Sequence, residues 1–518
     1  MSAIITDQIR ILNAKNFVAG IGATTNSYYS FIGLPNPSDV QSDWDQSPPA
    51  PKDNFDQEND YWDTMIALKK INAADVRQVV RKRVWSSGTI YDMYRDDYSS
   101  SNRAKISGAT NLYSASYYIL NSDFRVYECL QNGTDPDNPN GKPSLDEPTF
   151  TDLEPRSAGS SGDGYIWKYL YTIKPSDIVK FESTDFSPVP QDWATSTDAA
   201  SVRNNAVDGS LKIVTVTNRG TAIGNTATSY TNVPIKGNGS GAQCTVVVNN
   251  EYKIDSVTVT SQGSGYTYGS VDLTAGGVPT GTEIPTFDVI IPPEGGHGAD
   301  IYRELGAYNV LLYSRIENDT ENPDFITGNQ IARVGVVENP RVTSNSLLTA
   351  DKASAVPALR LTGVGYSSAT FTADTLIKQT IGTGKTAVGK VISYDSNTGV
   401  LKYWQDKSLV GFTTVGAAIT NPTYGYELLQ FTSTPSGTGN LTIVPDSGTN
   451  SNLGIDTVFS GISTVINNRT YNLGQSFVSG IAAPEAKKYS GNIIYVDNRP
   501  SITRSVNQKE DIKIILQF

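Results

Sequence analysis

Three short stretches of this 518-residue chain carry residue types that bind phosphate, bind calcium or assist a reaction in other proteins. The first, Gly384-Lys385-Thr386, ends like a phosphate-binding loop, in which backbone amides and a lysine hold the phosphates. The earlier glycine of such a loop falls at Gln379, and the residues that follow are β-branched instead of helical. Residues 382–387 fit a dinucleotide fingerprint in letters only, because the following helix is missing. We predict a turn and no nucleotide cofactor.

The second stretch, residues 135–141 (DPDNPNG), resembles a calcium loop because carboxylates and amides alternate along it. Pro139 occupies a ligand position, and no glutamate follows at the distance that the loop requires. We therefore predict a solvent-exposed loop around Asp135 and Asp137 without a metal ion.

The third stretch surrounds His297, the only histidine, in Gly295-Gly296-His297-Gly298. So many glycines predict a flexible junction. Without a second histidine there is no histidine-based zinc site, and a serine triad would have to recruit its base from this loop. A pair of glycosidase carboxylates stays an open alternative, because 52 acidic residues produce chance neighbours. We predict no catalytic, cofactor-binding or metal-binding residue, and hence no enzyme.

The composition favours strands, turns and polar loops. Charged residues make up only 18% of the chain, below the usual share, while tyrosine (28) and glycine (45) are plentiful. The net charge of −11 would repel phosphates, so we expect no nucleic-acid partner. The length suggests about three domains.

The first residues and the two cysteines indicate the cellular compartment in which the protein is made. Asp7, Arg10 and Lys15 interrupt the apolar pattern of residues 1–21, which predicts neither a signal peptide nor a membrane span. Cys129 and Cys244 are expected to be reduced thiols, since one distant disulfide is an unusual framework for so long a chain. We expect synthesis and assembly in a host cytoplasm.

Helix signals are confined to the first quarter. Thr6 or Asp7 could cap a short helix with Ile9 and Leu12 facing inward. Asp60 could cap a helix over 61–71, and residues 72–75 could cap another over 76–82 with its valines on one face. The proline-rich acidic stretch 41–60 predicts an extended arm, which could wrap a neighbour.

Two long stretches look like inserted β modules. Residues 208–293 hold a faint repeat, in which 212–217 (KIVTVT) recurs as 253–260 (KIDSVTVT), with glycine-rich turns between. Two copies are too few for a solenoid. Residues 346–482 contain a hairpin, with strands 386–394 and 400–404 joined by the loop DSNTG.

Two further segments have strong strand patterns. Asp163-Gly164 is a turn signal before residues 165–173, where Tyr and Trp alternate with other residues and give the strand one aromatic face. Near the end, 493–496 is an apolar strand, Asp497-Asn498-Arg499-Pro500 breaks it, and a final strand follows. Four of its side chains are expected to be buried on one face: Ile512, Ile514, Leu516 and Phe518.

These segments resemble those of a small wedge subunit of the baseplate in T-even-type contractile-tailed phages. That resemblance rests on Gly164-Tyr165-Ile166-Trp167, Ile494-Tyr495, Asn498-Arg499-Pro500 and the final strand. Residues 316–340 are similar to the family's strand, loop and strand ending in Asn-Pro, and residues 31–94 are similar in their proline elbow. The resemblance covers roughly 1–205, 300–345 and 485–518, and the two insertions look like those of longer versions in phages of cyanobacteria.

The resemblance implies a virion protein of the tail baseplate that pairs with a second copy as a homodimer. It would bridge other baseplate wedge proteins to peripheral fibre-anchoring proteins, without a membrane or nucleic-acid partner. We predict a mainly β, multidomain fold with a β-sandwich-like core, a few N-terminal helices and two inserted β modules. The expected segments are 1–207, 208–293, 294–345, 346–482 and 483–518.

The alternative function is a receptor-binding or glycan-cleaving tail protein, which the Tyr-, Trp-, Asn- and Thr-rich insertions would suit. Such proteins are usually intertwined trimers built on repeated β coils. The chain lacks a sustained repeat, which favours the structural wedge subunit.

Overall fold

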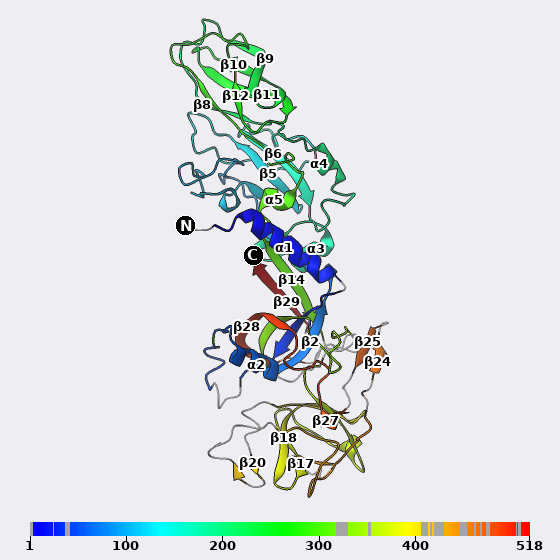
Figure 1. Cartoon of the computed structure of the whole chain (residues 1–518). Coiled ribbons are helices and arrows are strands. Elements are labelled where there is room, and N and C mark those ends of the chain that lie inside the picture. Colours follow the sequence, from blue (N-terminus) through cyan, green and yellow to red (C-terminus); the bar gives the residue numbers. More distant parts are fainter. Residues whose placement is uncertain are drawn as a thin grey trace. The chain divides into compact units, whose positions relative to one another are not determined.

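The fold is a series of antiparallel β-sheets with short helices, as Figure 1 shows in a computed structural model. The structure describes residues 4–23, 25–36, 42–317, 330–350, 354–405, 413–414, 417–418, 429–445, 453–459, 461, 463–466, 469–472, 477–503, 505 and 509–518. Two compact units share the chain. The first comprises Met1–Val18, Val76–Leu311 and Ile515–Phe518, and the second comprises Ala19–Asp75 and Leu312–Ile514. The predicted mainly β, multidomain fold is confirmed.

The core of the first unit is built on a three-stranded antiparallel sheet. Its strands are β4 (Tyr118–Leu120), β5 (Arg125–Asn132) and β6 (Tyr165–Thr172). The aromatic strand predicted after Asp163-Gly164 is therefore confirmed as β6, and Tyr165 and Trp167 are fully buried. A register shift opposite Cys129–Gln131 breaks the simple alternation, so that Trp167 and Lys168 are both buried.

Short helices of the first unit lie outside the first quarter of the chain, where sequence patterns did not indicate them. These are α3 (Pro175–Phe181), α4 (Ala200–Asn205) and α5 (Ile301–Leu305). A 3₁₀ turn, η2 (Leu112–Ser114), lies earlier in the same unit. None exceeds seven residues, and so short a segment shows little helical periodicity. Proline at the first position of α3 and Asp300 before α5 are the local signals that start two of them.

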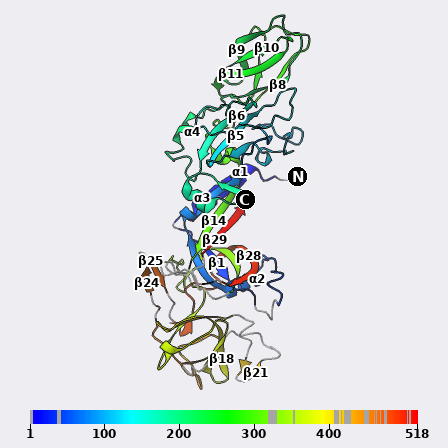
Figure 2. The same cartoon turned by 180° about the vertical axis from the view of Figure 1, so that it is seen from behind.

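The first insertion has a hydrophobic cluster of its own. Strands β9 (Thr228–Gly237), β10 (Ser240–Val248), β11 (Ile254–Ser264) and β12 (Gly269–Val271) form one sheet, and β8 (Val214–Asn218) pairs with β13 (Thr286–Val289). Both views show β9, β10 and β11 side by side (Figures 1 and 2). The apolar side chains between them, including Val233, Cys244 and Val246, are fully buried. The two predicted repeat segments correspond to β8 and β11.

The second unit contains a sheet with the strand order β2-β1-β15-β28. Its strands are β1 (Tyr28–Gly33), β2 (Met65–Ile71), β15 (Gln330–Glu338) and β28 (Asn492–Thr503). The predicted break at Asn498-Arg499-Pro500 is wrong, because β28 runs through it. The register against β15 shifts there, from Arg333↔Asn498 to Ile331↔Ile502. Pro500 is tolerated because β28 is an edge strand with an irregularity at this point.

Two predicted helices near the start are wrong. The helix α2 (Phe55–Thr64) ends where residues 65–71 form β2, and the segment predicted as a helix over 76–82 is the strand β3 (Val76–Arg81) after a 3₁₀ turn η1 (Ala73–Asp75). Met65, Ile66, Ala67 and Leu68 are all buried, a continuous run that suits a buried strand better than one face of a helix. The valines of β3 are β-branched, and the strand pairs with β7 (Phe186–Pro188).

The first helix and the acidic segment also differ from expectation. The helix α1 (Asp7–Gly22) buries Ile11 and Ala14, whereas Ile9 and Leu12 are 48% and 53% exposed. The described part of 41–60 lies against its own chain instead of extending as a free arm. The indole N–H of Trp44 donates to the carbonyl of Arg499 over 2.8 Å, and Trp44 is buried.

The second insertion forms another sheet with its own cluster. Its strand order is β17-β22-β23-β16-β19-β18-β20-β21. The bounds are β16 (Ala358–Thr362), β17 (Leu376–Gly382), β18 (Lys385–Asp395), β19 (Val400–Trp404), β20 (Thr413–Thr414), β21 (Ala417–Ala418), β22 (Thr442–Pro445) and β23 (Leu453–Ile455). The predicted hairpin is confirmed as β18 and β19. Two ribbons follow, β24 (Ser463–Ile466) with β25 (Arg469–Asn472) and β26 (Phe477–Val478) with β27 (Ile481–Ala482), and η3 (Tyr366–Ser368) is a short turn.

The final strand, β29 (Glu510–Gln517), is first in a sheet of order β29-β14-β3-β7, next to β14 (Asn309–Ile316). The division between the two units falls within β14 and β29. Of the four side chains expected to be buried, only Ile514 is, while Ile512, Leu516 and Phe518 are half-buried. An edge strand leaves such side chains partly open. The five-segment division of the chain stays a prediction, and part of the predicted loop in 316–340 lies outside the described residues.

Among the residues that the structure describes, none of the helices has the length and apolar character that crossing a membrane requires.

Candidate functional site

His297 lies in a tight loop of the first unit and is buried, only 6% exposed. The sequence predicts a flexible junction here, and the structure places the imidazole in the interior of the unit. Gly296 and Gly298, on either side, have φ angles of +89° and +90°, which glycine adopts without strain. A Cβ atom on Gly296 would come within 2.4 Å of the carbonyl oxygen of Val207. The glycines thus fold the loop closely against the chain and direct the imidazole inward.

Glu304 approaches the imidazole from α5, which begins immediately after this loop. Asp300 caps the helix, because its side chain accepts hydrogen bonds from the amides of Tyr302 and Arg303. The capped turn brings Oε1 of Glu304 to 2.9 Å from Nδ1 of His297. The other carboxylate oxygen accepts a hydrogen bond of 2.7 Å from the amide of Gly298. The loop and the helix therefore hold one another in place.

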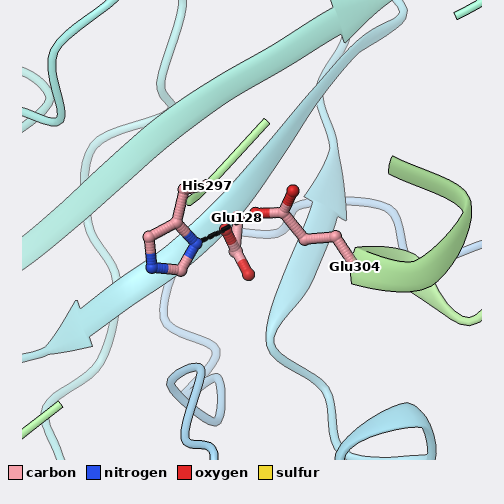
Figure 3. Close-up of side chains that lie close together, drawn as sticks. All are labelled: Glu128, His297 and Glu304. Atoms are coloured by element: carbon pink, nitrogen blue, oxygen red, sulfur yellow. Dashed lines mark hydrogen bonds and ion pairs between the residues drawn. The ribbon is translucent and has the colours of Figure 1, made fainter. Parts of the chain in front are cut away.

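Glu128 completes a cluster of three buried side chains, drawn in Figure 3. It comes from the middle of β5, where its register partner on β6 is Lys168. The Glu128 side chain is 0% exposed, and its Oε2 lies 2.8 Å from Nδ1 of His297. Two carboxylates thus converge on one ring nitrogen from a strand and a helix far apart in the sequence. Because the fold brings these residues together, their spacing in the sequence does not reveal the cluster.

The electrostatics of the cluster are strongly perturbed. Burial, with the neighbouring charge of Glu304, raises the pKa of Glu128 to about 8. Burial alone would lower the pKa of His297, but the two carboxylates outweigh it and raise that pKa to about 9. Burial opposes the ionised form of Glu304 too, yet contacts with His297 and the Gly298 amide hold its pKa below the usual value. An imidazolium beside an ionised Glu304 is the form favoured near neutral pH.

The chemistry open to this cluster is the sharing of protons or the binding of a cation. A serine triad places a hydroxyl against the imidazole nitrogen that takes its proton. Here carboxylates lie against Nδ1, and the ring of Tyr94 packs edge-on against the imidazole with centroids 4.8 Å apart. The arrangement gives no support to nucleophilic catalysis at His297.

The two other motif-like stretches lie in turns. Gly384 has a φ of +71° in the connection between β17 and β18, which agrees with the predicted turn. In the Asp135 loop, Oδ1 of Asp135 accepts hydrogen bonds from the amides of Asp137 and Asn138. Asp137 pairs with Arg219 at 2.9 Å. These carboxylates already have partners within the chain.

Both cysteines are free and buried, in agreement with the sequence expectation. Burial raises the pKa of Cys129 well above its ordinary value and that of Cys244 to about 11. Neither thiol is therefore activated as a nucleophile or a metal ligand at neutral pH.

A hollow of about 380 Å³ in the first unit is lined by aromatic and charged side chains, among them Arg77, Tyr171, Asp177 and Trp193. Tyr171 and Trp193 are 4% and 2% exposed, so they present almost no ring face on which a sugar could stack. Arg77 and Asp177 pair with each other at 3.3 Å. The hollow gives little support to glycan binding.

Comparison with known proteins identifies relatives of the chain. Residues 3–154 match the family described as Bacteriophage T4, Gp8. A region of 210 residues is 26% identical to the baseplate wedge protein gp8 of Enterobacteria phage T4. Over these residues the chain is similar to the baseplate wedge protein of that phage. The aligned region spans 36% of this chain and 60% of the T4 protein.

This similarity agrees with the resemblance to wedge subunits that the sequence itself shows. The matched residues 3–154 include β1, α2, β2, β3 and β5. Both insertions begin after residue 154, outside the region that the family match covers.

Proposed function

We propose that the chain is a structural subunit of the baseplate wedge that bridges inner wedge proteins to the peripheral proteins that carry or anchor tail fibres. The observation that carries this proposal is the family match over residues 3–154 together with the 26% identity to the T4 wedge protein. The subunit acts without catalysis, as a homodimer, in a contractile tail of a phage of cyanobacteria.

The mechanism is mechanical. Sheets with their own hydrophobic clusters keep their internal packing, while contacts between subunits rearrange when the baseplate changes state at the host surface. The clusters around Cys244 in the first insertion and around Leu401 in the second are dense enough for such rigid modules.

The experiment is reconstitution. The purified chain is measured alone by light scattering after size exclusion, then mixed with the other wedge proteins of the same phage. The proposal predicts a dimer that enters a complex of defined stoichiometry with the wedge proteins. A monomer or a trimer that stays apart from every wedge protein contradicts it. A trimer that binds host glycans would favour a receptor-binding protein instead.

A further inference from the structure

The Glu128–His297–Glu304 cluster needs either a bound proton or a cation to balance its charge in so buried a place. Two carboxylates face one imidazole, and the three ligand atoms all lie within 4.8 Å of one another. One imidazolium can neutralise only one of the two carboxylates. Enclosed carboxylates of this kind are costly unless a further positive charge or proton accompanies them.

Hydrogen bonding is also incomplete at Glu128. The Nδ1 atom bonds to Oε1 of Glu304, whereas Oε2 of Glu128 lies 2.8 Å from the same atom without the geometry of a hydrogen bond. The side chain is nevertheless 0% exposed and is aimed at Nδ1, as Figure 3 shows. A buried acceptor without a donor is uncommon in folded proteins.

The nearest candidate cation on the same sheet does not resolve this. Lys168 is the register partner of Glu128 and is buried, but its ammonium group donates to the carbonyl of Leu153. Among the described side chains, Glu128 is thus left with the imidazole of His297 as its ion-pair partner.

We propose that Glu128, His297 and Glu304 bind one divalent transition-metal ion of the zinc class. Two carboxylates and a divalent cation balance in charge, and the ion gives Glu128 a partner besides the imidazole. Imidazole nitrogen with carboxylate oxygen is a ligand set that suits zinc and its neighbours, whereas magnesium and calcium favour oxygen ligands alone. Zinc takes four ligands, so one water molecule enclosed with the ion would complete the set.

The surroundings support ligation by these atoms. The Gly298 amide holds Glu304 through its second oxygen, at 2.7 Å, and leaves Oε1 directed at the imidazole nitrogen. The Tyr94 ring packs against His297 and limits its rotation. Groups that orient metal ligands in this way commonly contribute tenfold or more to metal affinity. The ion would join β5, the His297 loop and α5, and so act as a structural metal within the first unit.

The test uses the full-length chain, freed of metal with a chelator and then titrated with cobalt(II) and zinc(II). We expect one ion per chain by elemental analysis, a visible absorption band with cobalt that zinc abolishes, and a higher unfolding temperature with zinc but not with magnesium. Glu128→Gln keeps the size of the side chain and should weaken cobalt binding at least tenfold. Its unfolding temperature in chelator should match that of the parent chain.

His297→Asn should weaken binding to a similar extent. Glu251→Gln is the matched control, since this carboxylate is 72% exposed and belongs to the same unit. Binding by Glu251→Gln equal to that of the parent supports the assignment. If the parent chain takes up no stoichiometric metal, or if Glu128→Gln binds it as tightly as the parent, the proposed site does not exist.

Discussion

The Nε atom of Arg333 donates a hydrogen bond of 2.8 Å to Oδ1 of Asn498, and this pair fixes the irregular part of β28 to β15. Arg333 is 1% exposed, and its guanidinium group lies over the rings of Tyr61 and Trp44, at 4.9 and 5.3 Å from their centres. Burial lowers the pKa of Arg333 to about 10, which leaves it charged at neutral pH. Residues 497–500, which the sequence predicts to interrupt a strand, are thus a packed irregularity within β28.

Arg333→Met should destabilise the protein by about 2–4 kcal/mol. It removes two cation–π contacts and takes a hydrogen-bond donor from the buried hydroxyl of Thr64 and from the half-buried Asn498. Arg499→Met is the control. Arg499 is next in sequence to Asn498, but its side chain is 68% exposed and pairs with Asp497, so a change within about 0.5 kcal/mol is expected. Urea unfolding of both variants measures the difference in their free energies of unfolding. Equal losses of stability would contradict a special role for the buried Arg333.

The final strand should depend on one residue more than on the others. Ile514 is 5% exposed, so Ile514→Ala should cost about 2–3 kcal/mol through lost burial and the cavity that remains. Ile502→Ala, on the same unit's β28, removes the same atoms from a side chain that is 57% exposed and should change stability by less than about 0.5 kcal/mol. Thermal unfolding distinguishes them. A mild Ile514→Ala would show that β29 contributes little.

The first insertion should be removable if the deletion keeps the residues that pack in the core of the first unit. Thr215 and Asp288 are antiparallel partners in β8 and β13, so an Asn-Gly turn can replace residues 216–287. Ile213 and Ile290 pack in the core of the first unit, and the short cut keeps them. We expect cooperative unfolding for this variant and clear destabilisation when 209–293 is replaced instead. Loss of the thermal transition in the short variant would contradict an independent module.

A pH dependence is expected at Glu154. Its carboxylate accepts hydrogen bonds from Lys212 at 2.9 Å and Gln262 at 2.7 Å, and contacts with Lys212, Asn205 and Gln262 outweigh burial and lower its pKa to about 2. A lowered pKa means that the stabilisation is present above the unfolded value of 4.5 and is lost as the pH falls toward about 2.

Glu154→Gln should therefore destabilise the chain at pH 7, by no more than about 1 kcal/mol because the carboxylate is 55% exposed. The difference from the parent should shrink between pH 4.5 and pH 3 in urea unfolding. Glu251→Gln serves as the comparison, because this carboxylate is 72% exposed and pairs with Lys253 at 3.0 Å. A Glu154→Gln effect that stays constant with pH would show that the interaction is not ionic.

Strand patterns with strong alternation or clear turn residues could be predicted from the sequence. The aromatic strand β6 and the β18–β19 hairpin are of this kind, because turn chemistry and a period of two are local properties. The sequence predicts helices over 61–71 and 76–82 because short apolar runs fit the helical period as well as the strand period. Tertiary pairing decides the outcome: residues 65–71 pair with β1, and the strand β3 pairs with β7, so both segments are strands.

The candidate site could not be predicted, although each of its residues is visible. A histidine between glycines resembles a mobile loop until the backbone φ angles and the contact of Gly296 with Val207 are known. Asp300 four residues before Glu304 is a helix-start signal that sequence reasoning could have used. Glu128 gives no signal, because its place beside His297 follows from the packing of β5 and not from spacing.

The central claim, a structural place in the baseplate wedge, is tested most directly by an electron cryo-microscopy map of the intact tail of the phage that encodes this chain. The proposal predicts that the chain fits density in each wedge, paired with a second copy and in contact with inner and peripheral wedge proteins. Density for the chain only at a fibre tip, or as a trimer outside the wedges, would contradict it.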